Sequence, residues 1–99
     1  MDKGILIKAI ETYGPANQLS QATEECAEFI QAVSKRRRAK DAVQTIRTID
    51  HLAEEIADCI IMMEQARLIV GANLVDNYIE LKLERLAERL EAQDGQSNI

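Results

Sequence analysis

Apolar residues recur at intervals of three and four along most of the chain, which is the spacing of helices with one buried face. Near the N-terminus, this pattern predicts a short helix over residues 3–12, which Gly14 stops. A second helix is predicted over residues 15–38, because Pro15 suits the first turn of a helix. The apolar face of this second helix carries Leu19, Ala22, Cys26, Phe29, Ile30 and Val33.

The start of the third helix can be interpreted in two ways. Asp41 and Gln44 together resemble a capping box, while Thr48 or Asp50 could equally begin the helix later. We place the main third helix over residues 49–70, because Gly71 directly after it can end it.

A fourth helix is predicted over residues 73–92, where Asn73 can cap the first turn. Its apolar stripe is typical of a contact face for another helix and consists of Ile79, Leu83, Leu86 and Leu90. The polar tail at residues 93–99 is expected to be flexible. The whole chain, residues 1–99, is therefore expected to form a single all-α domain.

Composition supports a helical fold and adds an expectation about assembly. The chain is 46% hydrophobic but only 3% aromatic, so its core must be built from Ala, Leu, Ile and Val. One proline and four glycines are too few for a turn-rich β fold. Because four helices in 99 residues leave apolar surface uncovered, we expect a homo-dimer or tetramer.

The charge of the chain limits its partners. A net charge of −5 argues against nucleic-acid binding, which needs a basic surface. The one basic run, from Lys35 to Arg38, is interpreted as a solvated helix end, with phosphate contact through Lys35 as the alternative. The most apolar stretch, residues 56–70, contains three charged residues, so we expect no membrane span. Two isolated cysteines and the absence of a secretory signal pattern predict a cytoplasmic protein.

The strongest chemical signal is a repeated pattern, E-E-x-A-[E/D]-x-I, at residues 24–30 and again at residues 54–60. Each copy places two carboxylates three residues apart, and therefore on one face of its helix. Each copy also carries a small alanine that would allow two helices to approach closely. If the two helices pack side by side, four carboxylates come together: Glu25, Glu28, Glu55 and Asp58.

Position around the third helix distinguishes these acids from ordinary surface residues. At about 100° per residue, Glu55 and Asp58 lie on the same side as Met62, on a helix whose apolar circumference predicts a central, buried position. Buried carboxylates are unfavourable unless they are paired, and no Lys or Arg of this helix is placed to pair with them. Because oxygen ligands favour a hard cation, we predict a Mg²⁺ site that Mn²⁺ can also occupy.

Other sites have weaker support in the sequence. A ferritin-like di-iron site needs Glu-x-x-His pairs, which neither helix supplies. The single histidine, His51, is interpreted as a surface or capping residue rather than a ligand. A zinc site is disfavoured because the chain lacks a Cys/His set with ligand spacing, and a glycine-rich phosphate loop is absent.

The pattern Glu24-Glu25-x-x-Glu28, followed about thirty residues later by Glu55-x-x-Asp58, resembles the MazG-like, all-α NTP pyrophosphohydrolase superfamily. That superfamily also includes dimeric dUTPases, dCTP pyrophosphatases and phosphoribosyl-ATP pyrophosphatases. The likeness covers roughly residues 10–90 and is greatest to small MazG-like proteins of phages or prophages. It extends to Tyr13-Gly14, Gln18-Leu19 and Lys82-Leu83-Glu84-Arg85.

The resemblance implies a four-helix MazG-like bundle that oligomerisation completes. It implies Mg²⁺-dependent hydrolysis of a (deoxy)nucleoside triphosphate to a monophosphate and pyrophosphate, a housekeeping reaction of the nucleotide pool. The implied metal ligands are Glu25, Glu28, Glu55 and Asp58. Glu24 or Glu28 is expected to take the proton from the attacking water.

Substrate contacts are expected from several parts of the chain. Lys82 and Arg85 form a basic stripe on the fourth helix that could hold the pyrophosphate, although ordinary surface pairing is the alternative. Gln18, Asn77 and Tyr78 are candidates for contacts with the base or sugar. The chain has no tryptophan to stack on a base, so the preferred base is not predicted.

Two other functions stay open at this point. A phosphoribosyl-ATP pyrophosphatase shares the carboxylate pattern but serves one biosynthetic step. A non-catalytic helical adaptor would use the helices for dimerisation alone, although the complete set of four carboxylates argues against it.

Overall fold

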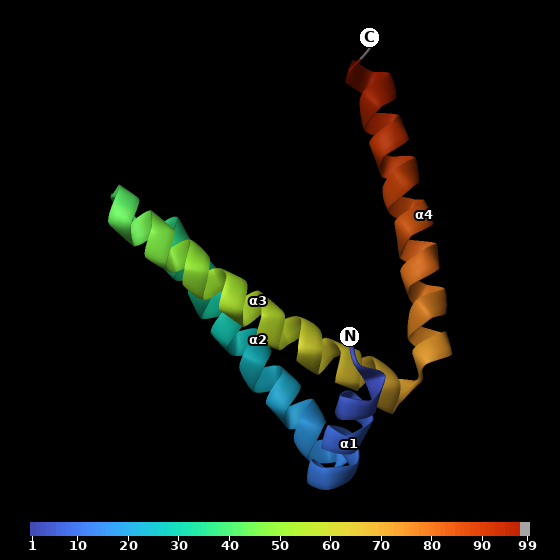
Figure 1. Cartoon of the computed structure of the whole chain (residues 1–99). Coiled ribbons are helices and arrows are strands. Elements are labelled where there is room, and N and C mark those ends of the chain that lie inside the picture. The colour runs from blue at the N-terminus through green and yellow to red at the C-terminus, as the bar shows by residue number, and fades with distance from the viewer. Residues whose placement is uncertain (98–99) are drawn as a thin grey trace. The chain divides into compact units, whose positions relative to one another are not determined.

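The computed structural model describes residues 1–97, which form four α-helices (Figure 1). They are α1 (Lys3–Tyr13), α2 (Pro15–Arg37), α3 (Ala42–Val70) and α4 (Ala72–Ser97). No strand occurs in this part of the chain, so the all-α prediction is confirmed. The chain divides into two compact units, Met1–Ile69 and a second that begins at Val70 and consists essentially of α4. None of the described helices combines the length and hydropathy of a membrane-spanning segment.

Individual residues set the start of α1 and the boundary between α1 and α2. Asp2 caps α1, since its Oδ1 accepts hydrogen bonds from the backbone N–H groups of Gly4 and Ile5 at 2.9 and 3.4 Å. Gly14 separates the two helices at φ 93°, a backbone conformation that residues with a side chain rarely adopt. Pro15 then begins α2, as predicted.

The start of α3 near residue 49 was predicted wrongly, because the earlier cap operates. The Oδ1 of Asp41 accepts a hydrogen bond from the backbone N–H of Gln44 at 2.8 Å. In return, the Gln44 Oε1 accepts one from the backbone N–H of Lys40 at 2.9 Å. The bond to Asp41 satisfies an N–H group that the first turn leaves without a helical partner, and the bond from Lys40 ties the residue before the cap to that turn. Thr48 lies inside the helix, where its hydroxyl donates to the carbonyl oxygen of Gln44 at 2.7 Å.

Both ends of α4 differ from the prediction. The helix begins at Ala72, and the carbonyl oxygen of Gly71 already accepts the first helical bond, from the N–H of Val75 at 3.1 Å. Asn73 therefore lies within the helix and does not cap it. At the other end, α4 continues beyond the predicted residue 92 to Ser97, and residues 98 and 99 lie outside the described part. The flexibility expected of the tail stays a prediction.

In the first unit, α2 and α3 lie side by side and run antiparallel (Figure 1). Two hydrogen bonds fix their register. The Nε2 of Gln18 donates to the Oε1 of Gln65 at 2.7 Å, and the Sγ of Cys59 donates to the backbone oxygen of Glu25 at 3.3 Å. Residue numbers thus rise along α2 as they fall along the facing part of α3.

The interior of the structure has few apolar side chains. Among the described residues, the buried hydrophobic ones are Leu6, Ala22, Ala32 and Met62, and the buried polar or charged ones are Gln18, Glu55 and Gln65. Ala32 is completely buried and Ala22 nearly so, so two small alanines of α2 belong to the interior. The alanines of the repeated motif, Ala27 and Ala57, are exposed, so the prediction that they allow two helices to approach closely was wrong.

The expected central, buried position of α3 is not found in the single chain. One face of α3 buries Glu55, Met62 and Gln65. The face roughly opposite, at about 100° per residue, carries five large apolar side chains that are 40% to 69% exposed: Ile46, Ile49, Ile56, Ile60 and Met63. With Ala53 they follow the alternating spacing of three and four residues that is typical of a coiled-coil seam.

The packing of α2 can be tested at Ala32, which is completely buried. Ala32→Leu adds volume where no space is left, and we expect it to lower the free energy of unfolding by about 1–3 kcal/mol. Urea denaturation followed by far-UV circular dichroism would measure this change. The matched control is Ala27→Leu on the exposed face of α2, which should change stability by less than about 0.5 kcal/mol. Equal effects of the two substitutions would contradict the packing.

Candidate metal centre

The antiparallel register explains why the two acidic motifs meet. Each motif contributes two carboxylates spaced by three residues. Because the helices run antiparallel, the first carboxylate of one motif faces the second carboxylate of the other. Glu25 on α2 therefore lies opposite Asp58 on α3, and Glu28 lies opposite Glu55. Glu25, Glu28 and Glu55 share one group of neighbouring carboxylates, and Asp58 belongs with Glu55 to a second. The role of these four residues as metal ligands stays a prediction.

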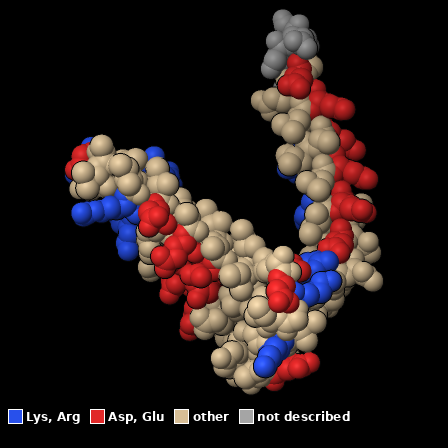
Figure 2. All heavy atoms as spheres, in the orientation of Figure 1, with Lys and Arg blue, Asp and Glu red and all other residues tan. Residues whose placement is uncertain are grey.

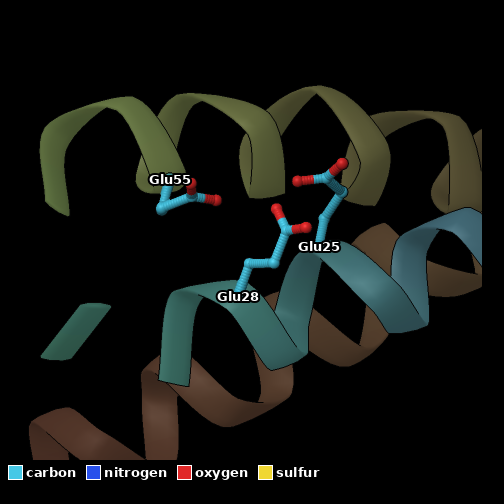
Figure 3. A group of neighbouring side chains, drawn as sticks. All are labelled: Glu25, Glu28 and Glu55. Atoms are coloured by element: carbon cyan, nitrogen blue, oxygen red, sulfur yellow. The ribbon is translucent and has the colours of Figure 1, made fainter. Parts of the chain in front are cut away.

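Two overlapping groups of carboxylates result. One oxygen from each of Glu25, Glu28 and Glu55 lies within 4.8 Å of the others, and Figure 3 shows the two α2 carboxylates reaching toward Glu55 on α3. On α3 itself, Glu54, Glu55 and Asp58 meet the same criterion. Glu55 belongs to both groups and is thus the centre of the cluster.

The cluster has negative charge that the protein itself does not neutralise. Glu55 is only 6% exposed, and the Oε2 atoms of Glu55 and Glu25 are buried without a hydrogen-bond partner. In the described part of the chain, no Lys or Arg forms an ion pair with these carboxylates; the nearest cationic candidate is His51, whose Nε2 lies 3.9 Å from the Glu55 Oε1. Unpartnered buried carboxylate oxygens are unfavourable, so the arrangement favours a bound cation.

The spacing fits a small divalent ion. Mg²⁺ binds oxygen at 2.0–2.1 Å, so ligands on its opposite sides lie about 4.2 Å apart. The oxygens of each group span a distance that accommodates such an ion with small side-chain movements. Glu28 and Glu54 are exposed, so an ion here would keep coordination positions open to solvent.

The surroundings of Glu25 disfavour its ionised form in the absence of a cation. Burial raises the pKa of Glu25, and the negative charges of Glu28 and Asp58 raise it further. A hydrogen bond from the Nε2 of Gln21 to the Glu25 Oε1, at 3.1 Å, acts in the opposite direction. A divalent ion would favour the carboxylate form and so offset the effect of burial.

The two thiols lie beside this cluster. Cys26 and Cys59 are both free and half-buried. Burial raises the pKa of the Cys59 thiol, and the nearby Cys26 adds to this rise. The thiol of Cys59 donates a hydrogen bond to the backbone oxygen of Glu25 on α2.

Charge is unevenly distributed along the α2–α3 pair. Figure 2 shows acidic side chains gathered midway along this pair and basic side chains toward its end. Lys35, Arg36 and Arg37 occupy the last turn of α2, where positive charge complements the helix dipole. Lys35 is exposed in this turn, so a phosphate contact by it stays a prediction.

The other residues predicted to contact the substrate lie in both units, one buried and four exposed. Gln18 is buried and its amide donates to Gln65 on the same α2–α3 interface as the acids. Four further candidates are exposed on α4, in the second unit: Asn77, Tyr78, Lys82 and Arg85. A role of these five residues in binding a substrate stays a prediction.

The surroundings of Glu55 include two residues that were not predicted to lie there. Glu24 is exposed and belongs to neither carboxylate group, whereas Glu54, which was not among the predicted ligands, belongs to one. His51 also adjoins the cluster, one helical turn before Glu55. The signal was present in both cases, because Glu54 is the first acid of the second motif and His51 precedes Glu55 by four residues.

Comparison of the chain with protein-family models, with curated proteins and with solved structures gives no match. The likeness to MazG-like proteins therefore rests on the motif residues alone.

Removal of one carboxylate tests whether the cluster is a metal site. In EDTA, Asp58→Asn should leave the unfolding temperature unchanged or raise it, because it removes one of several crowded negative charges. Added Mg²⁺ should stabilise the natural chain, by about 2.7 kcal/mol at a concentration of 100 times the Kd, and should stabilise the variant much less. Differential scanning calorimetry measures both effects.

The control for this experiment is Glu11→Gln, an exposed acid on α1 outside both groups. It should retain the full response to Mg²⁺. A large loss of stability of Asp58→Asn in EDTA would instead show that Asp58 is a structural hydrogen-bonding residue.

Proposed function

We propose that this chain is a Mg²⁺-dependent nucleoside triphosphate pyrophosphohydrolase of the MazG-like kind, which converts a (deoxy)nucleoside triphosphate to a monophosphate and pyrophosphate. The observation that carries the proposal is the buried Glu55, whose Oε2 has no partner, at the centre of carboxylates from two helices. The motif that supplies these carboxylates is the one on which the resemblance to this superfamily rests.

The partial exposure of the cluster favours an enzyme over a purely structural ion site. Structural sites surround the metal with protein ligands, whereas Mg²⁺ in phosphate chemistry takes one or two carboxylates and completes its coordination with water and substrate oxygens. Here Glu55 is buried while Glu28 and Glu54 are exposed, which leaves one side of the site accessible to a polyphosphate.

The residues divide into distinct roles in this proposal. Glu25, Glu28, Glu55 and Asp58 would hold the divalent ions, which would supply neutralisation of phosphate charge and a lower pKa for a coordinated water. Glu28 is exposed and belongs to a carboxylate group, so it is the better candidate to accept the proton of the attacking water. Glu24 is the less supported alternative, because it lies in neither group.

Contacts with the substrate complete the proposal. Lys82 and Arg85 would hold the outgoing pyrophosphate by electrostatic attraction. Gln18, Asn77 and Tyr78 would contact the base or sugar, and Lys35 a phosphate. The expected setting is the cytoplasm, where the two free thiols would remain reduced.

Two alternatives share part of this support. A phosphoribosyl-ATP pyrophosphatase would use the same carboxylates on one dedicated substrate. A helical adaptor would use only the exposed apolar faces, and it gives no reason for the unpartnered oxygens of Glu25 and Glu55.

The reaction is tested by measuring pyrophosphate release from a panel of ribo- and deoxynucleoside triphosphates, with Mg²⁺ and with EDTA. We expect Mg²⁺-dependent release from at least one of them and its loss in Glu55→Gln. Replacement of the proposed base, Glu28→Gln, should lower kcat by about 10²–10⁴-fold. The exposed Glu11→Gln should retain full activity.

Absence of release from the whole panel would overturn the first choice. Phosphoribosyl-ATP is then the next substrate, and hydrolysis of that compound alone would establish the first alternative. Failure on every substrate together with unchanged stability in Mg²⁺ would favour the adaptor.

We further propose that a second copy of the chain covers the seam of α3, in a homo-dimer or tetramer. The seam repeats at heptad spacing on one helix, so two copies can pack the same residues against each other. Analytical ultracentrifugation should give at least the mass of a dimer, and Ile60→Glu should shift it to the monomer. The control is Ile30→Glu on α2, because Ile30 is 66% exposed, against 53% for Ile60, and lies outside the seam. A monomeric natural chain would contradict the proposal.

A further inference from the structure

His51 lies beside Glu55, the residue that belongs to both carboxylate groups. It precedes Glu55 by four residues and Asp58 by seven, so all three side chains project from one face of α3. The His51 Nε2 lies 3.9 Å from the Glu55 Oε1, with 43% of the His51 side chain exposed against 8% of that of Glu55. The imidazole thus stands at the solvent edge of the carboxylate cluster.

The His51–Glu55 pair forms no direct hydrogen bond. A separation of 3.9 Å exceeds hydrogen-bond distance, and neither ring nitrogen has a partner in the described part of the chain. Two ligands on neighbouring positions of a first-row metal, at bond lengths near 2.1 Å, lie about 3.0–3.5 Å apart. A small rotation of either side chain would bring the two atoms to that separation.

The two oxygens of Glu55 have different surroundings. Its Oε2 is buried without a partner, and its Oε1 faces His51. Glu55 also belongs to both carboxylate groups, one completed from α2 and one formed within α3. A carboxylate in this position can serve two coordination spheres, one with oxygen ligands only and one that includes the imidazole nitrogen.

We propose that His51 provides a nitrogen ligand to an ion held by Glu55, and that this ligand makes the site select Mn²⁺ over Mg²⁺. Imidazole is a poor ligand for the hard Mg²⁺ ion and a good one for first-row transition metals, so it changes the order of affinities without changing the carboxylates. The inference rests on the metal site of the proposed function, but not on the identity of the reaction.

Affinity measurements without nucleotide test this inference. Isothermal titration calorimetry of the natural chain and of His51→Gln should be carried out with Mn²⁺ and, separately, with Mg²⁺. The natural chain is expected to bind Mn²⁺ at least tenfold more tightly than Mg²⁺. His51→Gln should lose about 10–100-fold in Mn²⁺ affinity and change its Mg²⁺ affinity by less than about threefold.

A spectroscopic measurement provides a second, independent readout. His51 is the only histidine of the chain, so its ring protons give a single, assignable set of NMR signals. Substoichiometric Mn²⁺ should broaden these signals strongly, and the broadening should disappear in Asp58→Asn, which lacks a neighbouring ligand. Signals that stay sharp while Mn²⁺ binds would overturn the inference.

The outcomes separate this inference from the proposed function. Equal losses for both metals in His51→Gln, or no loss for either, would refute the role of His51 and leave the pyrophosphohydrolase proposal standing. A selective loss of Mn²⁺ affinity in a chain that releases no pyrophosphate would support His51 and refute the reaction. If neither metal binds the natural chain, both proposals fail.

Discussion

The burial of Glu55 between α2 and α3 is the constraint on which the rest of the structure depends. Removing a carboxylate from water costs on the order of several kcal/mol, and here Glu25, Glu28 and Asp58 add repulsion around it. Without Lys or Arg ion pairs to the cluster in the described residues, the helices pack at an electrostatic cost. Binding of a divalent ion would remove that cost, so metal binding would be coupled to the packing of α2 on α3.

The α2–α3 pair can tolerate this cost because the backbone hydrogen bonds of each helix form independently of the interface. Long, uninterrupted helices make their own hydrogen bonds, and the Asp41 cap extends α3 well beyond the acidic motif. The Gln18–Gln65 hydrogen bond satisfies the other buried polar side chains within the protein. Glu55 therefore differs from its buried polar neighbours, since its Oε2 alone among them requires a partner from outside the chain.

Features that depend on helical periodicity could be predicted from the sequence. Features that depend on which of several similar residues takes a given role could not. The apolar spacing predicts four helices, and the repeated motif predicts that Glu25 lies near Asp58. Both predictions succeed because they depend only on helical geometry. The start of α3 depends on which of several possible residues caps the helix, and their capping free energies differ by only about 1 kcal/mol. His51 was missed as a neighbour of the site because a histidine at a helix start is consistent with several roles until its distance from Glu55 is known.

The two faces of α3 differ in chemistry. The acidic residues and His51 lie on the face toward α2, whereas the seam from Ile46 to Met63 lies roughly opposite. A partner on the seam would exclude water from one side of α3 without covering the carboxylates on the other. It would also hold α3 straight along the length that carries Glu54, Glu55 and Asp58. In this arrangement, assembly would order the ligands of α3 while the face toward α2 remains free to respond to the metal.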